Sequence, residues 1–135
     1  MRTGSRLRYF LGIDGGGSKC DAVLLDEDGT VLGWGRGGAT NYRPTEDCAA
    51  SVCQAVTAAI GETPVRELWV AHTWVAQGLR EWLGGAGIAV QGALRVQEWE
   101  IAYLTAGRTW GVAVHAGTGS WVQIRTPDGR RPRIG

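Results

Sequence analysis

The stretch Phe10-Leu-Gly-Ile-Asp-Gly-Gly-Gly-Ser-Lys19 decides the fold, because its apolar residues lead into a glycine-rich loop that carries one acid and one lysine. A second apolar run follows the loop at residues 22–25. The turn signal Asp28-Gly29 then leads to a third run at residues 31–35. Apolar runs joined by glycine turns predict three antiparallel strands that meander along one sheet.

Helix and strand patterns alternate after these strands. Apolar residues at helical spacing over residues 45–60 predict a long helix that Thr45 caps and Gly61 ends. The remaining expected elements are a strand at 68–75, a short helix at 79–83, a strand at 88–96 bulged near Gly92 and a helix at 98–106. Hairpins followed by crossover units predict an α/β fold, a mixed sheet covered by helices in the order β-β-β-α-β-α-β-α.

The glycine pattern returns near the C-terminus. Val112-Ala-Val-His-Ala-Gly-Thr-Gly-Ser120 is an apolar run with a second glycine loop, and the turn signal Asp128-Gly129 follows. A repeat of this kind predicts a duplication, with a first domain over residues 1–108. Residues 109–135 are then the opening hairpin of a second, similar domain that the chain leaves incomplete. The alternative is a coincidence, since hairpins with Asp-Gly turns are common.

Glycine-rich turns bind anions, because successive backbone N–H groups form a concavity that oxygens can approach closely. Lys19, the one lysine among 14 basic residues, adds a positive charge, and Asp14 is placed to hold Mg²⁺ through water. Two such loops predict a site for the β- and γ-phosphates of ATP, with plain structural turns as the alternative. The predicted nucleotide-binding residues are Asp14, Gly15, Gly16, Gly17, Ser18, Lys19, Gly117, Thr118, Gly119 and Ser120.

Composition and charge argue against several other classes of protein. A sequence that is 44% hydrophobic and 20% charged is typical of a folded globular protein. A net charge of +1 without a basic run gives no electrostatic footprint for nucleic acid. The apolar runs are too short for a signal peptide or a membrane span, so we expect a cytoplasmic protein. The three cysteines lack the spacing of a zinc site or a disulfide framework.

Leu11-Gly-Ile-Asp-Gly-Gly-Gly-Ser-Lys19 resembles the first phosphate motif of the N-acetylglucosamine kinase and BadF/BadG/BcrA/BcrD-type ATPase family, in the actin, sugar-kinase and Hsp70 superfamily. Ala116-Gly-Thr-Gly-Ser-Trp121 resembles its second phosphate motif. The resemblance implies two ribonuclease-H-like domains around an ATP cleft, with ATP and Mg²⁺ as cofactors and a small sugar as acceptor. It also implies that Asn41 contacts the sugar.

Two positions depart from the pattern of this family. Its kinases carry an Asp at the start of the third helix as general base, where this chain has Glu98, one methylene longer. Glu98 is therefore the candidate catalytic base, and an ordinary helix-start acid is the alternative. After the fourth strand, His72-Thr73-Trp74 replaces small residues, so the sugar pocket is reshaped or lost. His72 itself is expected to be structural.

The sequence thus predicts an ATP-dependent phosphotransferase of the N-acetylglucosamine-kinase type, truncated and inactive alone. One alternative is a BadF/BadG-type ATPase without sugar kinase activity, although no cysteine follows Cys53 to hold a shared cluster. Another is a non-catalytic remnant that binds nucleotide or sugar, which the early end of the chain favours. A terminal hairpin that exposes Trp110 and Trp121 favours self-association as a homodimer.

Overall fold

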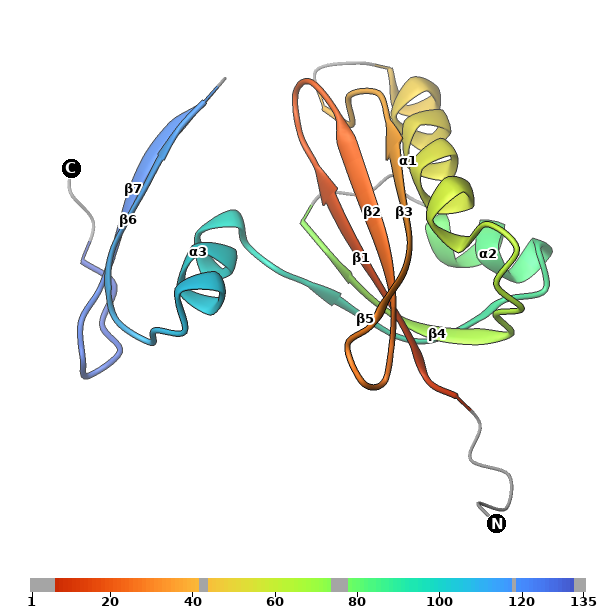
Figure 1. Ribbon diagram of the computed structural model, residues 1–135. Helices are drawn as coiled ribbons and strands as arrows, with labels where there is room; N and C mark the ends of the chain where they lie inside the picture. Colours follow the sequence, from red (N-terminus) through yellow and green to blue (C-terminus); the bar gives the residue numbers. More distant parts are fainter. Residues whose placement is uncertain (1–6, 42–43, 74–77, 118, 133–135) are drawn as a thin grey trace, which may run out of the picture. The chain divides into compact units, whose positions relative to one another are not determined.

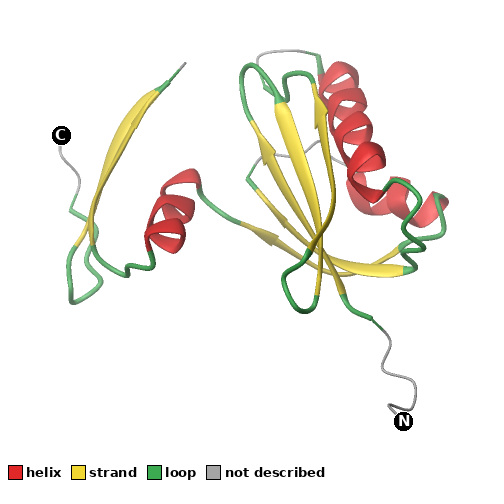
Figure 2. Ribbon diagram, in the orientation of Figure 1, coloured by secondary structure: helices red, strands yellow, loops and turns green. Residues whose placement is uncertain are grey.

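The computed structural model describes residues 7–41, 44–73, 78–117 and 119–132. The chain divides into two compact units, Met1–Arg95 and Val96–Gly135. Figures 1 and 2 show the elements of each unit. In the first unit they are β1 (Tyr9–Gly15), β2 (Cys20–Asp26), β3 (Val31–Gly37), α1 (Thr45–Ile60), β4 (Glu67–His72), α2 (Leu79–Gly85) and β5 (Ala89–Arg95). In the second they are α3 (Glu98–Ala106), β6 (Gly111–Ala116) and β7 (Ser120–Arg125).

The first unit is built on a five-stranded mixed sheet with the strand order β3-β2-β1-β4-β5. β2 pairs antiparallel with both β1 and β3, whereas β4 runs parallel to β1 and β5 runs parallel to β4. The predicted mixed sheet and the predicted order of elements are confirmed. The bulge is confirmed too, since the β4–β5 register shifts by one residue just before Gly92.

One face of this sheet carries the core, because α1 and α2 both cover it (Figure 2). Alternate strand residues such as Leu11 and Leu68 point into the core and meet Val52 of α1 and Leu83 of α2, and all four side chains are fully buried. Alternation places Asp14, two residues beyond Gly12, on the other face of β1.

Helix α1 lies directly on the glycines of β3. A Cβ atom built on Gly33, Gly35 or Gly37 would come within about 2 Å of a carbonyl oxygen of α1. At Gly35 that oxygen belongs to Ala55, at 2.1 Å. These glycines therefore set the distance between helix and sheet, which explains why they alternate along the strand.

Several predicted boundaries differ from the observed ones. The N-cap of α1 is Pro44 rather than Thr45, and the Pro44 carbonyl accepts hydrogen bonds from the amides of the first turn. α2 includes Gly84 and Gly85, because its last turn closes at Ala86. β4 ends at His72, and residues 74–75 of the predicted strand lie outside the described residues. The predicted end of α1 at Gly61 and both bounds of α3 are confirmed.

The second unit consists of α3 and the β6–β7 hairpin. The hydroxyl oxygen of Tyr103 lies 3.0 Å from the carbonyl oxygen of Gly111 and 2.9 Å from that of Gln123, so it ties the helix to both strands. Trp110 is exposed as predicted, but Trp121 is half-buried. Since α3 groups with this hairpin, the domain boundary expected near residue 108 stays a prediction.

The turns that follow β2 and β7 have the same geometry. The amide of Gly29 donates to the carbonyl of Asp26, and the amide of Gly129 donates to the carbonyl of Thr126. Both glycines have φ of +81°, a left-handed conformation that favours glycine. The repeat found in the sequence is therefore also a repeat in backbone structure at these two turns.

Within the described part of the chain, no helix has the length and apolar character needed to cross a membrane.

Candidate nucleotide-phosphate site

The first glycine loop is the four-residue turn between β1 and β2. Gly15 pairs with Cys20 across the hairpin, and the amide of Gly16 donates to the carbonyl of Lys19 at 2.9 Å. Among the described residues, the backbone amides of Gly17 and Ser18 have no hydrogen-bond partner. These two amides are the donors that the turn can offer to an anion.

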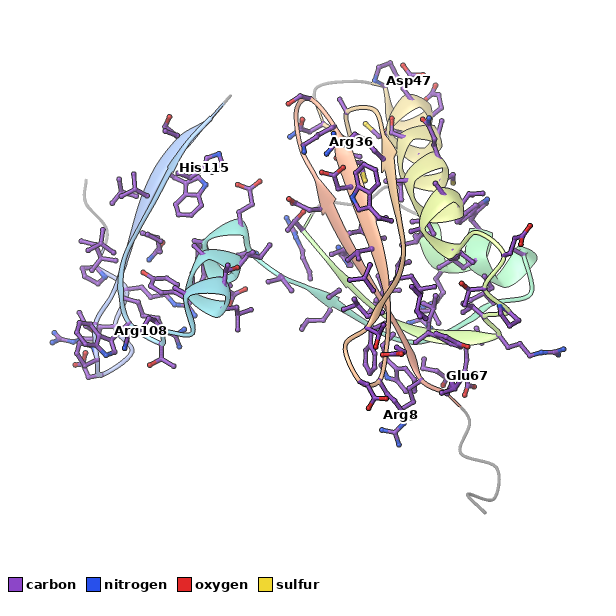
Figure 3. All side chains as sticks on the ribbon, in the orientation of Figure 1. Arg8, Arg36, Asp47, Glu67, Arg108 and His115 are labelled. Atoms are coloured by element: carbon purple, nitrogen blue, oxygen red, sulfur yellow. The ribbon has the colours of Figure 1, made fainter. Side chains whose placement is uncertain are left out.

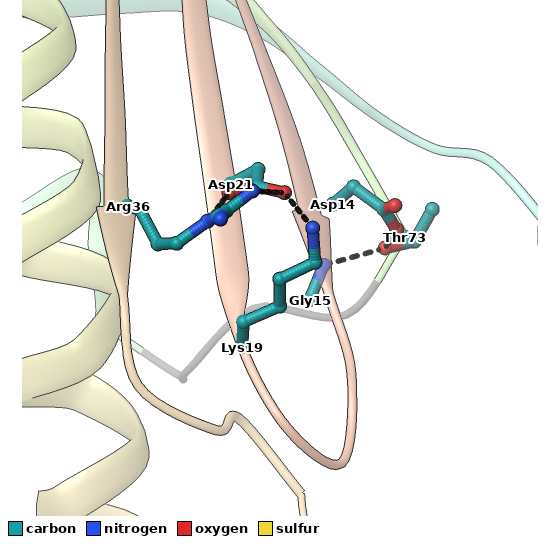
Figure 4. A network of polar contacts seen from close by, with 6 residues as sticks. All are labelled: Asp14, Gly15, Lys19, Asp21, Arg36 and Thr73. Atoms are coloured by element: carbon teal, nitrogen blue, oxygen red, sulfur yellow. Dashed lines mark hydrogen bonds and ion pairs between the residues drawn. The ribbon is translucent and has the colours of Figure 1, made fainter. Parts of the chain in front are cut away.

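Asp14 lies at the end of β1 on the sheet face that the helices leave open. Its carboxylate oxygen Oδ1 accepts a hydrogen bond of 2.9 Å from the hydroxyl of Thr73 (Figure 4). The other oxygen, Oδ2, has no partner among the described residues. A single free carboxylate oxygen beside a glycine turn fits Mg²⁺, which is usually held by one or two carboxylates, water and phosphate oxygens.

The described part of the chain offers no ready-made cluster of metal ligands. Within the described ranges, no group of three or more His, Cys, Asp and Glu side chains gathers around a common point. A cation at Asp14 would thus take its remaining ligands from water and from a bound phosphate.

Lys19 makes an ion pair instead of standing free over the turn. Its Nζ lies 2.8 Å from Asp21 Oδ2, and Arg36 bonds both oxygens of the same carboxylate (Figure 4). The hydrogen bond from Arg36, with a smaller contribution from Lys19, holds the pKa of Asp21 below its usual value. The Lys19 side chain is 54% exposed. Since exposed pairs contribute about 0–1 kcal/mol, a phosphate group can compete for this ammonium.

The network lies at one end of the first unit. Figure 3 shows Arg36 and Asp47 at that end and Arg8 and Glu67 at the other. The segment after β3 also reaches this end, because the amide of Thr40 donates to the carbonyl of Gly16 at 2.9 Å.

Two buried acceptors in this segment are unsatisfied. The atoms Thr40 Oγ1 and Asn41 Oδ1 are buried and lack a hydrogen-bond partner among the described residues. Buried polar atoms usually have a partner. Asn41 Oδ1 is thus an acceptor without a partner in the described part of the chain, within the segment that reaches the first turn.

The second glycine loop joins β6 to β7. Ala116 pairs with Ser120, and the amide of Gly117 donates to the carbonyl of Gly119 at 3.0 Å. Thr118, a predicted phosphate ligand, lies outside the described residues. A Cβ atom on Gly117 would come within 2.8 Å of His115 Nε2, so the imidazole would have to move to accommodate a side chain there.

Glu98 and the second loop meet through Trp121. The indole Nε1 of Trp121 donates to Glu98 Oε2 at 3.1 Å, and the indole ring stacks on His115 with 5.4 Å between centroids. The candidate base and the residue that follows Ser120 are thus hydrogen-bonded within the second unit. This contact could not be predicted from the sequence, because residues 98 and 121 belong to different elements.

Burial shifts the pKa of two other titratable side chains near the first loop, Cys20 and His72. Burial raises the pKa of the Cys20 thiol to about 11, with further contributions from the charges of Asp21 and Asp14. This thiol is therefore protonated at neutral pH and a poor nucleophile. Burial, and to a lesser extent the charge of Arg95, lowers the pKa of His72.

Sequence reasoning missed Thr73, Asp21 and Arg36 as parts of this site. Counting back from the Asp28-Gly29 turn pairs Asp21 with Arg36 on neighbouring strands, so this ion pair had a usable signal. Thr73 had none, because its contact with Asp14 depends on the parallel pairing of β1 with β4.

Comparison with known proteins agrees with this arrangement. The model of the BadF/BadG/BcrA/BcrD ATPase family matches residues 11–135, a range that includes both glycine loops. The chain belongs to the BadF/BadG/BcrA/BcrD ATPase family. Among curated proteins, a search found no match.

Two solved structures share the fold of this BadF/BadG/BcrA/BcrD family member. One is a candidate N-acetylglucosamine kinase from Chromobacterium violaceum, with a TM-score of 0.70 and 24% identity over 93% of this chain and 48% of the other. The second is a ROK family glucokinase from Streptomyces griseus in complex with glucose and AMPPNP, with a TM-score of 0.56 and 19% identity over 91% of this chain and 47% of the other. The chain thus spans about half the length of these structures, and the predicted actin-like fold class is confirmed.

Proposed function

We propose that this chain supplies the phosphate-binding turns of an ATP-dependent phosphotransferase of the N-acetylglucosamine-kinase type, whose acceptor is a sugar or amino-sugar hydroxyl. The observation that carries the proposal is the first turn. There the amides of Gly17 and Ser18 and the carboxylate oxygen Oδ2 of Asp14 all lack a partner among the described residues. Donors for phosphate oxygens and an acid for a hydrated cation are what a nucleotide-phosphate site requires.

In this proposal each glycine turn binds phosphate oxygens of ATP, the first through residues 15–19 and the second through residues 117–120. Asp14 holds Mg²⁺ through water, and the ion supplies charge neutralisation on the phosphates. Lys19 moves from Asp21 to a phosphate oxygen, which the weakness of an exposed ion pair allows.

Glu98 is proposed as the general base and Asn41 as a sugar contact. The acceptor oxygen forms its bond to the γ-phosphorus while the bond to the β–γ bridging oxygen breaks. ADP leaves, and the hydroxyl proton passes to Glu98. The hydrogen bond from Trp121 supports this role, since it orients one oxygen of the longer Glu side chain. The vacant acceptor Asn41 Oδ1 supports a hydrogen bond from a second sugar hydroxyl.

Isothermal titration of Mg·ATP into the 135-residue chain tests the proposed phosphate site. We expect Asp14→Asn to weaken binding about 10-fold or more, because the variant loses the charge that attracts the cation. The matched control is Asp28→Asn, which removes the same charge from an exposed turn of the same unit. An absence of binding by the wild-type chain, or equal weakening by both variants, would contradict the phosphate site.

A second candidate function is ATP hydrolysis without sugar transfer, which the match to an ATPase family favours. Incubation of the protein with ATP, with and without an amino-sugar panel, separates the two functions. Sugar phosphate indicates a kinase, whereas free phosphate alone indicates an ATPase. A stoichiometric iron content would indicate a BadF-type activator. The absence of any turnover would indicate a remnant that only binds nucleotide or sugar.

We also propose that the chain self-associates through the β6–β7 hairpin. Trp110, Val112 and Val114 are between 57% and 70% exposed there, and exposed apolar strand surface favours pairing with another chain. Sedimentation velocity over a range of concentrations measures the homodimer that this surface would form.

A further inference from the structure

Thr73, the residue after β4, continues the parallel pairing with β1 by one step. Its amide donates to the carbonyl of Ile13 at 3.0 Å, which fixes its backbone beside the end of β1. Its side chain then reaches two neighbouring residues of that strand. Oγ1 lies 3.0 Å from the amide nitrogen of Gly15 and 2.9 Å from Asp14 Oδ1 (Figure 4). Thr73 is only 7% exposed.

The direction of these two hydrogen bonds is fixed by chemistry. A backbone amide can only donate, so the Thr73 oxygen accepts from Gly15. The hydroxyl has one proton, and the carboxylate of Asp14 can only accept it. The chain of bonds therefore runs from Gly15 N–H through the Thr73 hydroxyl to Asp14 Oδ1.

The hydrogen bond from Thr73 restricts the rotation of the Asp14 carboxylate. Asp14 is exposed at the end of a strand, where its carboxylate would otherwise rotate freely. Threonine is branched at Cβ and stiff about χ1, and here both hydrogen-bonding capacities of its hydroxyl are used. Oδ1 is thereby engaged by the protein, and Oδ2 is the oxygen without a partner in the described part of the chain.

We propose that Thr73 is the positioning residue of the phosphate site, which holds Asp14 so that one defined carboxylate oxygen faces the hydrated cation of Mg·ATP. The inference rests on the proposed function and adds to it Thr73, which the sequence alone did not place in the site. Hydrogen bonds to the carboxylates around a metal ion orient them, and losing such an outer partner typically costs about 10–100-fold in metal affinity.

The test is the Mg²⁺ dependence of ATP binding by the full 135-residue chain, measured by calorimetry in EDTA and at increasing Mg²⁺. For Thr73→Val, which keeps the shape and removes the hydroxyl, we expect the half-saturating Mg²⁺ concentration to rise about 10-fold or more. Binding of metal-free ATP should stay unchanged. Thr73→Ser should restore most of the wild-type Mg²⁺ dependence, because it restores the hydroxyl.

Thr40→Val is the matched control, since Thr40 is also buried beside the first turn and its hydroxyl has no partner among the residues that the structure describes. We expect it to keep the wild-type Mg²⁺ dependence. The inference would be overturned if Thr40→Val raised the half-saturating Mg²⁺ concentration as much as Thr73→Val does. It would also be overturned if Thr73→Val weakened metal-free and Mg²⁺-dependent ATP binding equally, since that would indicate a merely structural role for Thr73. If Thr73→Val does not fold, Thr73→Ala against Thr73→Ser gives the same comparison.

The two proposals fail in different ways. A wild-type chain that binds no Mg·ATP removes the phosphate site, and the inference falls with it. A wild-type chain that binds Mg·ATP, with Thr73→Val binding it at the same Mg²⁺ concentration, leaves the phosphate site standing and removes Thr73 alone.

Discussion

Asp21 is the residue on which two cations of the first unit converge. Lys19 comes from the glycine turn and Arg36 from β3, and both bond the same carboxylate on the open face of the sheet. Arg36 also lies 5.0 Å from the ring centre of Trp34, which helps to hold its guanidinium in place. The carboxylate therefore links the first glycine turn to the edge strand of the sheet.

We predict that Asp21→Asn destabilises the chain by about 1 kcal/mol at pH 7, the upper range for partly exposed ion pairs. The pKa of Asp21 is lowered in the folded state, mainly by Arg36. Its stabilising effect is thus present above the unfolded pKa, about 3.9, and is lost as the pH falls through the lower folded pKa. Urea unfolding at pH 7 and at about pH 2 measures this.

The wild-type chain and Asp21→Asn should approach equal stability at about pH 2, where Asp21 is protonated in both the folded and the unfolded state. Asp28→Asn serves as the control, because its side chain makes no ion pair among the described residues. A destabilisation by Asp21→Asn that is the same at both pH values would show that the ion pairs do not cause it.

Helix α1 packs closely on β3 because the strand has glycine at the three positions that face the helix. The glycines at 33, 35 and 37 leave room for the helix backbone, which approaches the strand closely enough that any Cβ atom would collide. The same helix buries Val52 and Val56 against the sheet. The segment between β3 and α1 also reaches the first glycine loop, where the amide of Thr40 donates to the carbonyl of Gly16.

Gly35→Ala should therefore destabilise the first unit by about 3 kcal/mol, the upper range for overpacked cores. The new Cβ would lie 2.1 Å from the Ala55 carbonyl oxygen and 2.6 Å from Ala58 Cβ, so the helix must shift. Gly84→Ala is the control, since nothing lies within 4 Å of a Cβ there. That variant should be stabilised by up to about 1 kcal/mol, as alanine favours a helix.

Chemical denaturation of both variants and of the wild-type chain measures these differences in the free energy of unfolding. Equal stability of Gly35→Ala and the wild-type chain would mean that α1 does not rest on β3 as described.

Over the whole molecule, burial is distributed unequally between the two units. The main core runs from Leu11 to Ile88 and lies entirely in the first unit. Among the described residues of the second unit, only the apolar side chains of Tyr103 and Ala113 are buried. A hairpin with one short helix is too small to be stable on a core of this size.

We predict that residues 1–95 alone unfold cooperatively in urea with a midpoint close to that of the whole chain. Residues 96–135 alone should show no cooperative transition by far-ultraviolet circular dichroism. A sharp unfolding transition of the isolated 96–135 segment would show that its few buried groups suffice, and would contradict this account.

The sequence alone predicted those features that depend on neighbouring residues. The turns at Gly29 and Gly129, the end of α1 at Gly61 and both bounds of α3 follow from backbone preferences of a few residues. The two glycine loops were found in the same way, since their composition and repeat are local. Thr45 was misread as a cap because a proline before it closes the first turn with its carbonyl alone.

Only the tertiary structure decided which side chains meet at the candidate site. Thr73 reaches Asp14 across 59 positions of sequence, through a parallel strand pair that forms only after a crossover through α1. Trp121 reaches Glu98 across 23 positions, once α3 has packed beside the second hairpin. Hydroxyl, indole and carboxylate groups are common in any sequence, and their partners are set by sheet register and helix packing. The two glycine turns were therefore predictable from composition, whereas the orientation of the acids beside them was not.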